Sequence, residues 1–199
     1  MRKGFTLVEI IIVLGITIML TSVLIVYTRG GEKQIIFFKD QTVLVSSLLR
    51  AKAFAIETFQ PKLQPGLDPA QEIICGWGVS FSRNSKEYTI FKDLPIPNDT
   101  DCANANKSFD KTGEAFEAFE FSEIVEIDCL ALNGSLNGSC LNSNNESKID
   151  IVFIPPDPLT EFYPKKLPET KEAVIVITLK DKTRNSVIRI TKAGQISFR

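Results

Sequence analysis

The first feature of the chain is an apolar run over residues 5–27, FTLVEIIIVLGITIMLTSVLIVY, in which Glu9 is the only charged residue. A helix rises about 1.5 Å per residue, so this run is long enough to cross the roughly 30 Å hydrocarbon core of a bilayer. Arg2 and Lys3 come directly before it, and the positive-inside rule then keeps the amino terminus in the cytoplasm. The pattern predicts one membrane-spanning helix, with the rest of the chain on the extracytoplasmic side.

A second helical pattern follows Gly30-Gly31. Apolar positions recur in steps of three and four, which is typical of an amphipathic helix; they are Ile35, Phe38, Val45, Leu48, Leu49, the stem of Lys52, Ile56 and Phe59. Each glycine costs about 1 kcal/mol in a helix relative to alanine, which predicts a kink or a local melt at Gly30-Gly31. We expect the helix to end at residues 59–61, because the residue before Pro61 is pushed out of helical dihedrals.

The rest of the chain has the pattern of a loop followed by strands. Residues 60–71 hold three prolines and a glycine, which predicts a surface loop. Strands are expected at 73–82, 87–92, 121–128, 148–154, 173–181, 186–191 and 195–198. Residues 173–179 are apolar at consecutive positions, so both faces of that strand are expected to be buried, one against the helix and one inside a second sheet. The predicted fold class is α+β, with a long amino-terminal helix packed on an antiparallel β-sheet or a two-sheet sandwich.

Composition adds a strong exclusion. The chain has 199 residues, 24% of them charged and 44% hydrophobic, which suits one globular domain with an extra segment. It contains no histidine, so serine triads, Cys-His proteases and histidine-ligated zinc hydrolases are excluded. No nucleophile or phosphate-loop motif is present either. We expect no enzyme activity and no cofactor; a membrane-anchored enzyme that uses the helix only for location is the alternative class.

Two simpler explanations of the apolar run leave observations unexplained. A secretory signal peptide has an apolar stretch of only about 7 to 15 residues and ends at an A-x-A-like site, and no such site follows Tyr27. A plain single-pass anchor does not explain Glu9, because an acidic side chain at mid-bilayer costs about 2.5 to 3.5 kcal/mol. The position of Glu9 near the cytoplasmic end lowers this cost, but a partner for its charge is still expected.

The segment Gly4-Phe5-Thr6-Leu7-Val8-Glu9, with basic residues before it and an apolar run after it, resembles the cleavage and methylation signature of type IV prepilins and pseudopilins. The resemblance implies that a prepilin peptidase cuts between Gly4 and Phe5 and methylates the new amine of Phe5. It also implies that Glu9 of one subunit pairs with the Phe5 amine of a neighbour in a filament, since charges in a low-dielectric bundle are tolerated when paired. The motif covers about the first 30 residues only.

The order of the elements is similar to that of the GspH/FimT type of minor pseudopilins. The matching segments are residues 47–55 (SLLRAKAFA), 77–81 (WGVSF) and 189–195 (RITKAGQ); the polar insertion over 98–145 departs from the pattern. The resemblance implies a leader at 1–4, a transmembrane and filament-core helix at 5–28, its amphipathic half at 29–60, and an extracytoplasmic β-rich domain at 61–199. The implied location is the cytoplasmic (inner) membrane and then a type IV pilus or a type II secretion pseudopilus. The implied partners are the prepilin peptidase, other pilins or pseudopilins and the assembly platform.

The four cysteines, Cys75, Cys102, Cys129 and Cys140, all lie in the part expected outside the cytoplasm. An even count in that compartment favours disulfides. Of the three possible connectivities we favour Cys75 with Cys102 and Cys129 with Cys140. A zinc site would need a C-x-x-C pair or a histidine, and neither is present; free buried thiols are the other alternative.

Acidic residues recur at every third position from 114 to 126, between phenylalanines and isoleucines. A catalytic carboxylate pair or a calcium site could be imagined here, but a calcium loop needs Asn and Asp ligands around a glycine turn, and no such spacing is present. The pattern therefore indicates a solvated acidic face, and we assign no metal and no catalytic residue. The members are Glu114, Glu117, Glu120, Glu123 and Glu126.

The carboxyl-terminal end of the chain is basic. Some minor pilins of the resembled type bind DNA with carboxyl-terminal arginines, so a DNA-binding minor pilin of a competence system is the alternative function. No aromatic residues interleave with these basic ones, and such residues are often simply solvated or guard a sheet edge. The candidate phosphate contacts are Lys182, Arg184, Arg189, Lys192 and Arg199. Docking of this basic end on the acidic stretch of a neighbouring subunit is a further expectation.

Overall fold

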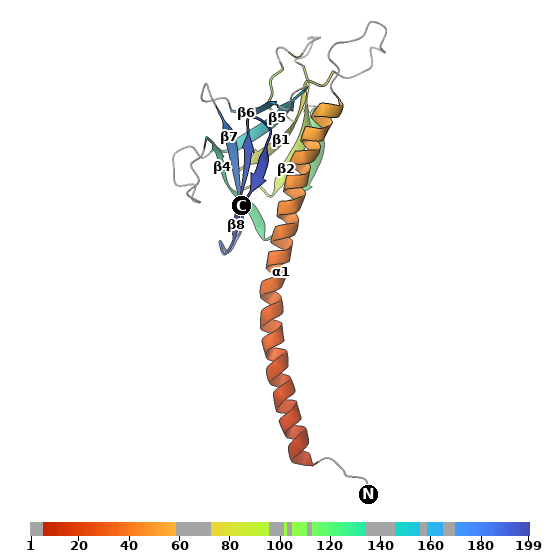
Figure 1. Ribbon diagram of the computed structural model, residues 1–199, viewed down its shortest axis with the longest axis vertical. Coiled ribbons are helices and arrows are strands. Elements are labelled where there is room, and N and C mark those ends of the chain that lie inside the picture. The colour runs from red at the N-terminus through yellow and green to blue at the C-terminus, as the bar shows by residue number, and fades with distance from the viewer. Residues whose placement is uncertain are drawn as a thin grey trace. The chain divides into compact units, whose positions relative to one another are not determined.

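The computed structural model describes residues 6–58, 73–95, 102, 105–110, 113–133, 146–155, 159–164 and 170–199. The chain divides into two units, Met1–Lys39 and Asp40–Arg199, and helix α1 (Leu7–Glu57) contributes to both (Figure 1). Helical backbone continues through Gly30 and Gly31, so the local melt predicted there does not occur. A cost of about 1 kcal/mol per glycine is small once a helix is nucleated and extended on both sides.

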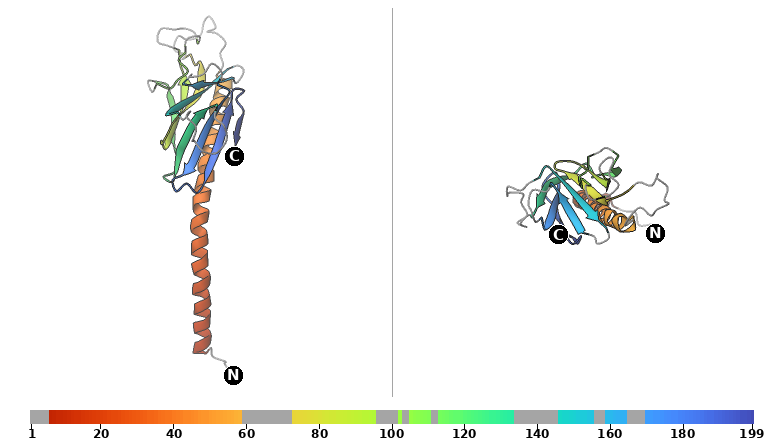
Figure 2. Two further views of the ribbon diagram at one scale, coloured as in Figure 1. Left: turned by 90° about the vertical axis from the view of Figure 1, so that its left-hand side faces the viewer. Right: turned by 90° about the horizontal axis from the view of Figure 1, so that it is seen from above.

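The second unit contains two antiparallel sheets (Figure 2). The five-stranded sheet, here called sheet A, has the order β3-β2-β1-β5-β6, and the four-stranded sheet B has the order β4-β7-β8-β9. The α+β class is therefore confirmed, and the layers are compatible with a pilin-like fold. The strands are β1 (Gly76–Ser82), β2 (Glu87–Asp93), β3 (Ala115–Glu120), β4 (Val125–Leu132), β5 (Lys148–Ile154), β6 (Leu159–Tyr163), β7 (Glu172–Leu179), β8 (Asn185–Thr191) and β9 (Ile196–Phe198).

All seven predicted strands are present, but two edge strands of sheet A were not predicted. Strand β3 lies inside the acidic repeat, and β6 is only five residues long. The strand expected at 121–128 begins at Val125 instead, because residues 121–124 turn the chain from β3 to β4, with Val125 N donating to Ser122 O at 2.9 Å. The prediction that the acidic repeat forms a solvated face is wrong at one position, since Glu114 is buried.

The buried face of the second half of α1 differs from the predicted one. Leu49 and Ile56 are 52% and 53% exposed, although both belong to the predicted apolar stripe. Near the end of the helix the buried residues are small ones, Ala51 and Ala55, because a helix packed closely on sheets needs short side chains at the contact. The other buried residues of this half are Phe37, Asp40, Gln41, Leu44, Ser47 and Leu48.

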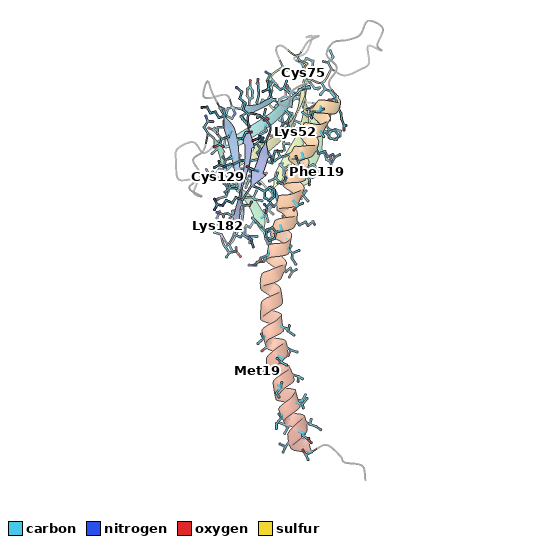
Figure 3. The ribbon with its side chains drawn as sticks, viewed as in Figure 1. Met19, Lys52, Cys75, Phe119, Cys129 and Lys182 are labelled. Atoms are coloured by element: carbon cyan, nitrogen blue, oxygen red, sulfur yellow. A yellow bond between two sulfur atoms is a disulfide. The ribbon has the colours of Figure 1, made fainter. Side chains whose placement is uncertain are left out.

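Polar contacts attach this half of α1 to turns of both sheets. The Asp40 carboxylate accepts hydrogen bonds from Ser122 N (2.8 Å) and Ser122 Oγ (3.1 Å) in the turn between β3 and β4. Lys52 Nζ donates to Gly194 O (2.9 Å) in the turn between β8 and β9 (Figure 3). Each contact satisfies a group that would otherwise be costly to bury, so the helix is fixed at one turn of each sheet.

An aromatic cluster joins α1 to the centre and one edge of sheet A. Trp77 of β1 lies 4.8 Å from Phe54 and 4.9 Å from Phe116 of β3, between ring centroids, and Trp77 Nε1 donates to Thr58 Oγ1 at 2.9 Å. Trp77 is buried and is the only tryptophan of the chain. Its fluorescence therefore reports on the packing of helix and sheet.

Strand β7 is buried on both faces, as its consecutive apolar residues predicted. Ala173, Ile175 and Ile177 are fully buried on one face. On the other face Val174 and Val176 pack with Cys129 of β4. Sheet B thus has apolar side chains on both sides of its centre.

The cysteines form disulfides. Cys75 and Cys102 are bonded, with their Cα atoms 5.2 Å apart, which is the favoured pairing. Cys129 is also disulfide-bonded, and none of the described cysteines is free. Cys140, its expected partner, lies outside the described residues. Figure 3 shows Cys75 and Cys129 in different parts of the second unit.

Gly78 in the central strand β1 provides a first test of this packing. A Cβ at Gly78 would lie 2.5 Å from Phe91 Cζ and 2.8 Å from the carbonyl oxygen of Ile151. We expect Gly78→Ala to destabilise the protein by about 1–3 kcal/mol, because the backbone oxygen cannot move away cheaply. The measurement is urea unfolding of the full chain in detergent, followed by Trp77 fluorescence. Gly31→Ala, with nothing within 4 Å of its new Cβ, is the control; equal unfolding midpoints for both variants would contradict the packing.

Candidate functional site

The candidate site is the amino-terminal end of α1. Of its predicted residues, Gly4 and Phe5 lie outside the described part of the chain, and Thr6 and Glu9 lie inside it. Ile10 N donates to Thr6 O at 3.3 Å, so Thr6 occupies the N-cap position of the helix. Glu9 is in the first turn of α1, where a negative charge interacts favourably with the helix dipole.

Thr6 and Glu9 bond to each other reciprocally. Thr6 N and Thr6 Oγ1 donate to Glu9 Oε2 at 3.2 and 3.1 Å, and Glu9 N donates to Thr6 Oγ1 at 3.3 Å. This is a capping box, the arrangement favoured by Thr or Ser followed three residues later by Glu. The sequence T-L-V-E carries this signal, so it predicts a partner for Glu9 within its own helix, besides the amine of a neighbouring subunit.

The capping box leaves part of the carboxylate available. Both bonds from Thr6 go to Oε2, and no described residue bonds Oε1. Glu9 is also exposed. A carboxylate oriented by two donors, whose other oxygen is bonded by none of the described residues, can accept a charge-assisted hydrogen bond from a cation on another molecule.

The segment that follows suits a hydrocarbon environment. Leu7–Leu24 is the one stretch among the described residues that is long and apolar enough to cross a membrane, and none of it is buried. Its hydroxyl groups donate to carbonyls one turn earlier in the helix, Thr17 Oγ1 to Leu14 O at 2.9 Å and Ser22 Oγ to Met19 O at 2.8 Å. Polar groups satisfied within the helix need no water. Met19 and its apolar neighbours are exposed (Figure 3).

The basic residues considered for DNA are not all brought to one place, since Lys182, Arg184 and Arg199 lie near the first end of β8 (Asn185–Thr191) and Arg189 and Lys192 lie further along it. Lys182, in the turn from β7 to β8 (Figure 3), pairs with Asp128 at 2.7 Å and Glu126 at 3.3 Å, and the hydrogen bond to Asp128 raises the pKa of the lysine. Arg189 Nη1 lies 3.6 Å from Glu172 Oε2 in the middle of sheet B. Lys192 begins the turn at the opposite end of β8. These charges are in part neutralised within the chain, Lys182 by Glu126 and Asp128 and Arg189 by Glu172.

The remaining two candidates lie near the first end of β8. Arg184 directly precedes β8 and interacts within the described structure. Arg199 N and O pair with Val187 O and N, both at 3.0 Å, so the main chain of Arg199 extends the β8–β9 ladder. No group of three or more metal-ligating side chains occurs among the residues that the structure describes.

Comparison of the chain with protein-family models, with curated proteins and with solved structures finds no match.

Proposed function

We propose that this chain is a minor pilin or pseudopilin, a structural subunit of a type IV pilus or a type II secretion pseudopilus. The observation that carries the proposal is the segment Gly4-Phe5-Thr6-Leu7-Val8-Glu9 at the start of an exposed apolar helix. An α+β unit with two antiparallel sheets follows that helix, and this architecture is compatible with the fold the proposal requires.

In the proposed mechanism the helix is first stored in the cytoplasmic (inner) membrane, with the second unit on the extracytoplasmic side. A prepilin peptidase cuts after Gly4, where an absent side chain leaves the backbone accessible, and methylates Phe5. The new amine has an ordinary pKa of about 8 and is mostly cationic. Glu9 of a neighbouring subunit then accepts this charge, with Thr6 orienting its carboxylate.

Assembly exchanges lipid for protein around the apolar helix. Residues 7–24 have no cover within the chain, so lipid covers them before assembly and the helices of other subunits cover them afterwards. Leu49 and Ile56 extend the exposed apolar surface along α1. The proposed partners are other pilins or pseudopilins and the assembly platform, and the proposal assigns no catalytic residue, cofactor or metal.

DNA binding is not part of the proposal. A DNA phosphate backbone would have to contact several of the five basic candidates at once. Two of these candidates, Lys182 and Arg189, already have carboxylate partners in the chain.

The experiment is intact-mass and amino-terminal analysis of the full chain, produced with and without an active prepilin peptidase. We expect a chain that begins at methylated Phe5 only when the peptidase is present. Gly4→Val should remain uncleaved, because its side chain hinders the approach of the protease. A wild-type chain that still begins at Met1, in cells where the same peptidase processes another prepilin, would contradict the proposal.

A further inference from the structure

Residues 105–110 lie on the face of sheet A that is turned away from α1. Tyr88 of β2 faces the helix, where its hydroxyl meets Ser47 Oγ at 3.2 Å, and alternate residues of a strand point to opposite faces. Phe91 and Asp93 therefore lie on the outer face, and the ring of Phe109 packs on Phe91 with 5.3 Å between centroids. Residues 105–110 are called the strap below.

Three buried carboxylates hold the strap by its main chain. Asp93 Oδ1 accepts from Lys107 N at 3.0 Å, Asp150 Oδ2 from Phe109 N at 3.1 Å, and Glu114 Oε2 from Asp110 N at 3.1 Å. The three acidic residues are only 1%, 2% and 4% exposed, respectively. Carboxylates from three different segments thus bond three of the four amides from 107 to 110.

The charges around these carboxylates are unequal. Asp150 has a direct counter-charge, since Lys148 Nζ lies 2.9 Å from its Oδ2. The ammonium nearest Asp93 is that of Lys107, which pairs instead with Glu161 of β6 at 3.0 Å. Asp93 Oδ2 has no hydrogen-bond partner in the described structure.

The charged side chains that act on Glu114 among the described residues are acidic. The charged groups that act on it are Asp110 of the strap and Asp93 of β2. Burial raises the pKa of Glu114 to about 7 and the pKa of Asp93 to about 6, from ordinary values of 4.5 and 3.8. Both carboxyl groups are therefore neutral in mild acid and ionised in mild base while the strap is in place.

We propose that the strap responds to pH: it is closed on the outer face of sheet A while Asp93 and Glu114 are protonated, and it loosens when both ionise. Raised pKa values of carboxyl groups mean that the closed state is favoured below their ordinary pKa values. That stabilisation is lost as the pH rises through about 6 and 7. Above this range the ionised carboxylates are stabilised by hydration, which favours the open strap. Opening of the strap exposes Phe91 and Phe109.

The test is hydrogen exchange of the full chain in detergent, measured by mass spectrometry at pH 5.5 and 8.0 with exchange times corrected for the intrinsic rate. We expect the protection of strap amides to fall about tenfold or more between these pH values, since one pKa unit corresponds to a factor of ten. Peptides from the buried strand β7 should not change. Wild-type protection of the strap that is equal at both pH values would overturn the proposal without any variant.

Variants assign the response to the two residues. The double variant Asp93→Asn with Glu114→Gln should keep, at pH 8.0, the protection that the wild type shows at pH 5.5. Glu120→Gln, an exposed glutamate of β3, is the matched control and should keep the wild-type response. A folded double variant that loses protection with pH as the wild type does would overturn the proposal. If the double variant fails to fold, each single variant should show a smaller pH response than the Glu120→Gln control.

Discussion

A chain with Glu9→Ala is expected to reach the membrane but not to enter filaments. In the proposed assembly the methylated amine of Phe5 enters a helix bundle, where an unpaired charge costs several kcal/mol. Removal of the carboxylate takes away the only acidic group in residues 5–27, so no group of this segment replaces it. The measurement compares the amounts of protein in the membrane fraction and in sheared or detergent-resistant filaments of cells that assemble them.

Glu9→Gln separates the two roles that Glu9 has in this protein. Glutamine at this position of a capping box still accepts the bond from the N-cap residue, so the helix start is preserved while the charge is lost. We expect Glu9→Gln to fail in assembly as fully as Glu9→Ala, with membrane insertion and cleavage after Gly4 retained by both. Normal filament entry of the glutamine variant would show that the cap, and not the charge, is what Glu9 supplies.

Loss of the disulfide between Cys75 and Cys102 is expected to destabilise the second unit by about 3–4 kcal/mol. The two bonded cysteines are 27 residues apart in the sequence. The chain-entropy relation for a loop of this length gives a value in that range. This is a large share of the 5–15 kcal/mol that stabilises a typical domain. The variant is Cys75→Ser with Cys102→Ser, and the measurement is urea unfolding of the full chain in detergent, followed by Trp77 fluorescence.

Two comparisons control this experiment. Reduction of the wild-type chain should lower the unfolding midpoint at least as far, because it also opens the disulfide of Cys129. Cys129→Ser alone removes only that second bond, so its effect on the midpoint can be subtracted. An unchanged midpoint in the Cys75/Cys102 double variant would show that the second unit keeps its stability without this covalent bond.

Sequence patterns predicted the elements whose side chains follow a simple period. The apolar run at the amino terminus and seven of the strands were found in this way. Strand β3 was missed because Phe116 and Phe119 are three residues apart, which matches the period of the acidic repeat around them and not the period of two that a strand has. A register shift opposite Ile90 and Phe91 lets both rings face α1, and a bulge of this kind has no signal in a single sequence.

The buried face of α1 was missed for a different reason. Leu49 and Ile56 are exposed, while Ala51 and Ala55 are buried, so at these positions side-chain size pointed to the wrong side of the helix. The strap could not have been predicted at all. Its carboxylates come from β2, from β5 and from the residue before β3, and only the pairing of these strands places them under one loop.

The strand order of sheet A sets a limit on when the second unit can fold. The central strand β1 pairs with β5, so residues 76–82 acquire this neighbour only after residues 148–154 have been made. Sheet B is completed later still, because β4 must wait for β7. A chain that emerges from its amino terminus therefore lacks the strand partners of β1 and β4 until most of it has been synthesised. Folding dominated by such distant pairings is slow and exposed to aggregation, so a nascent chain that stalls before residue 172 has no finished core.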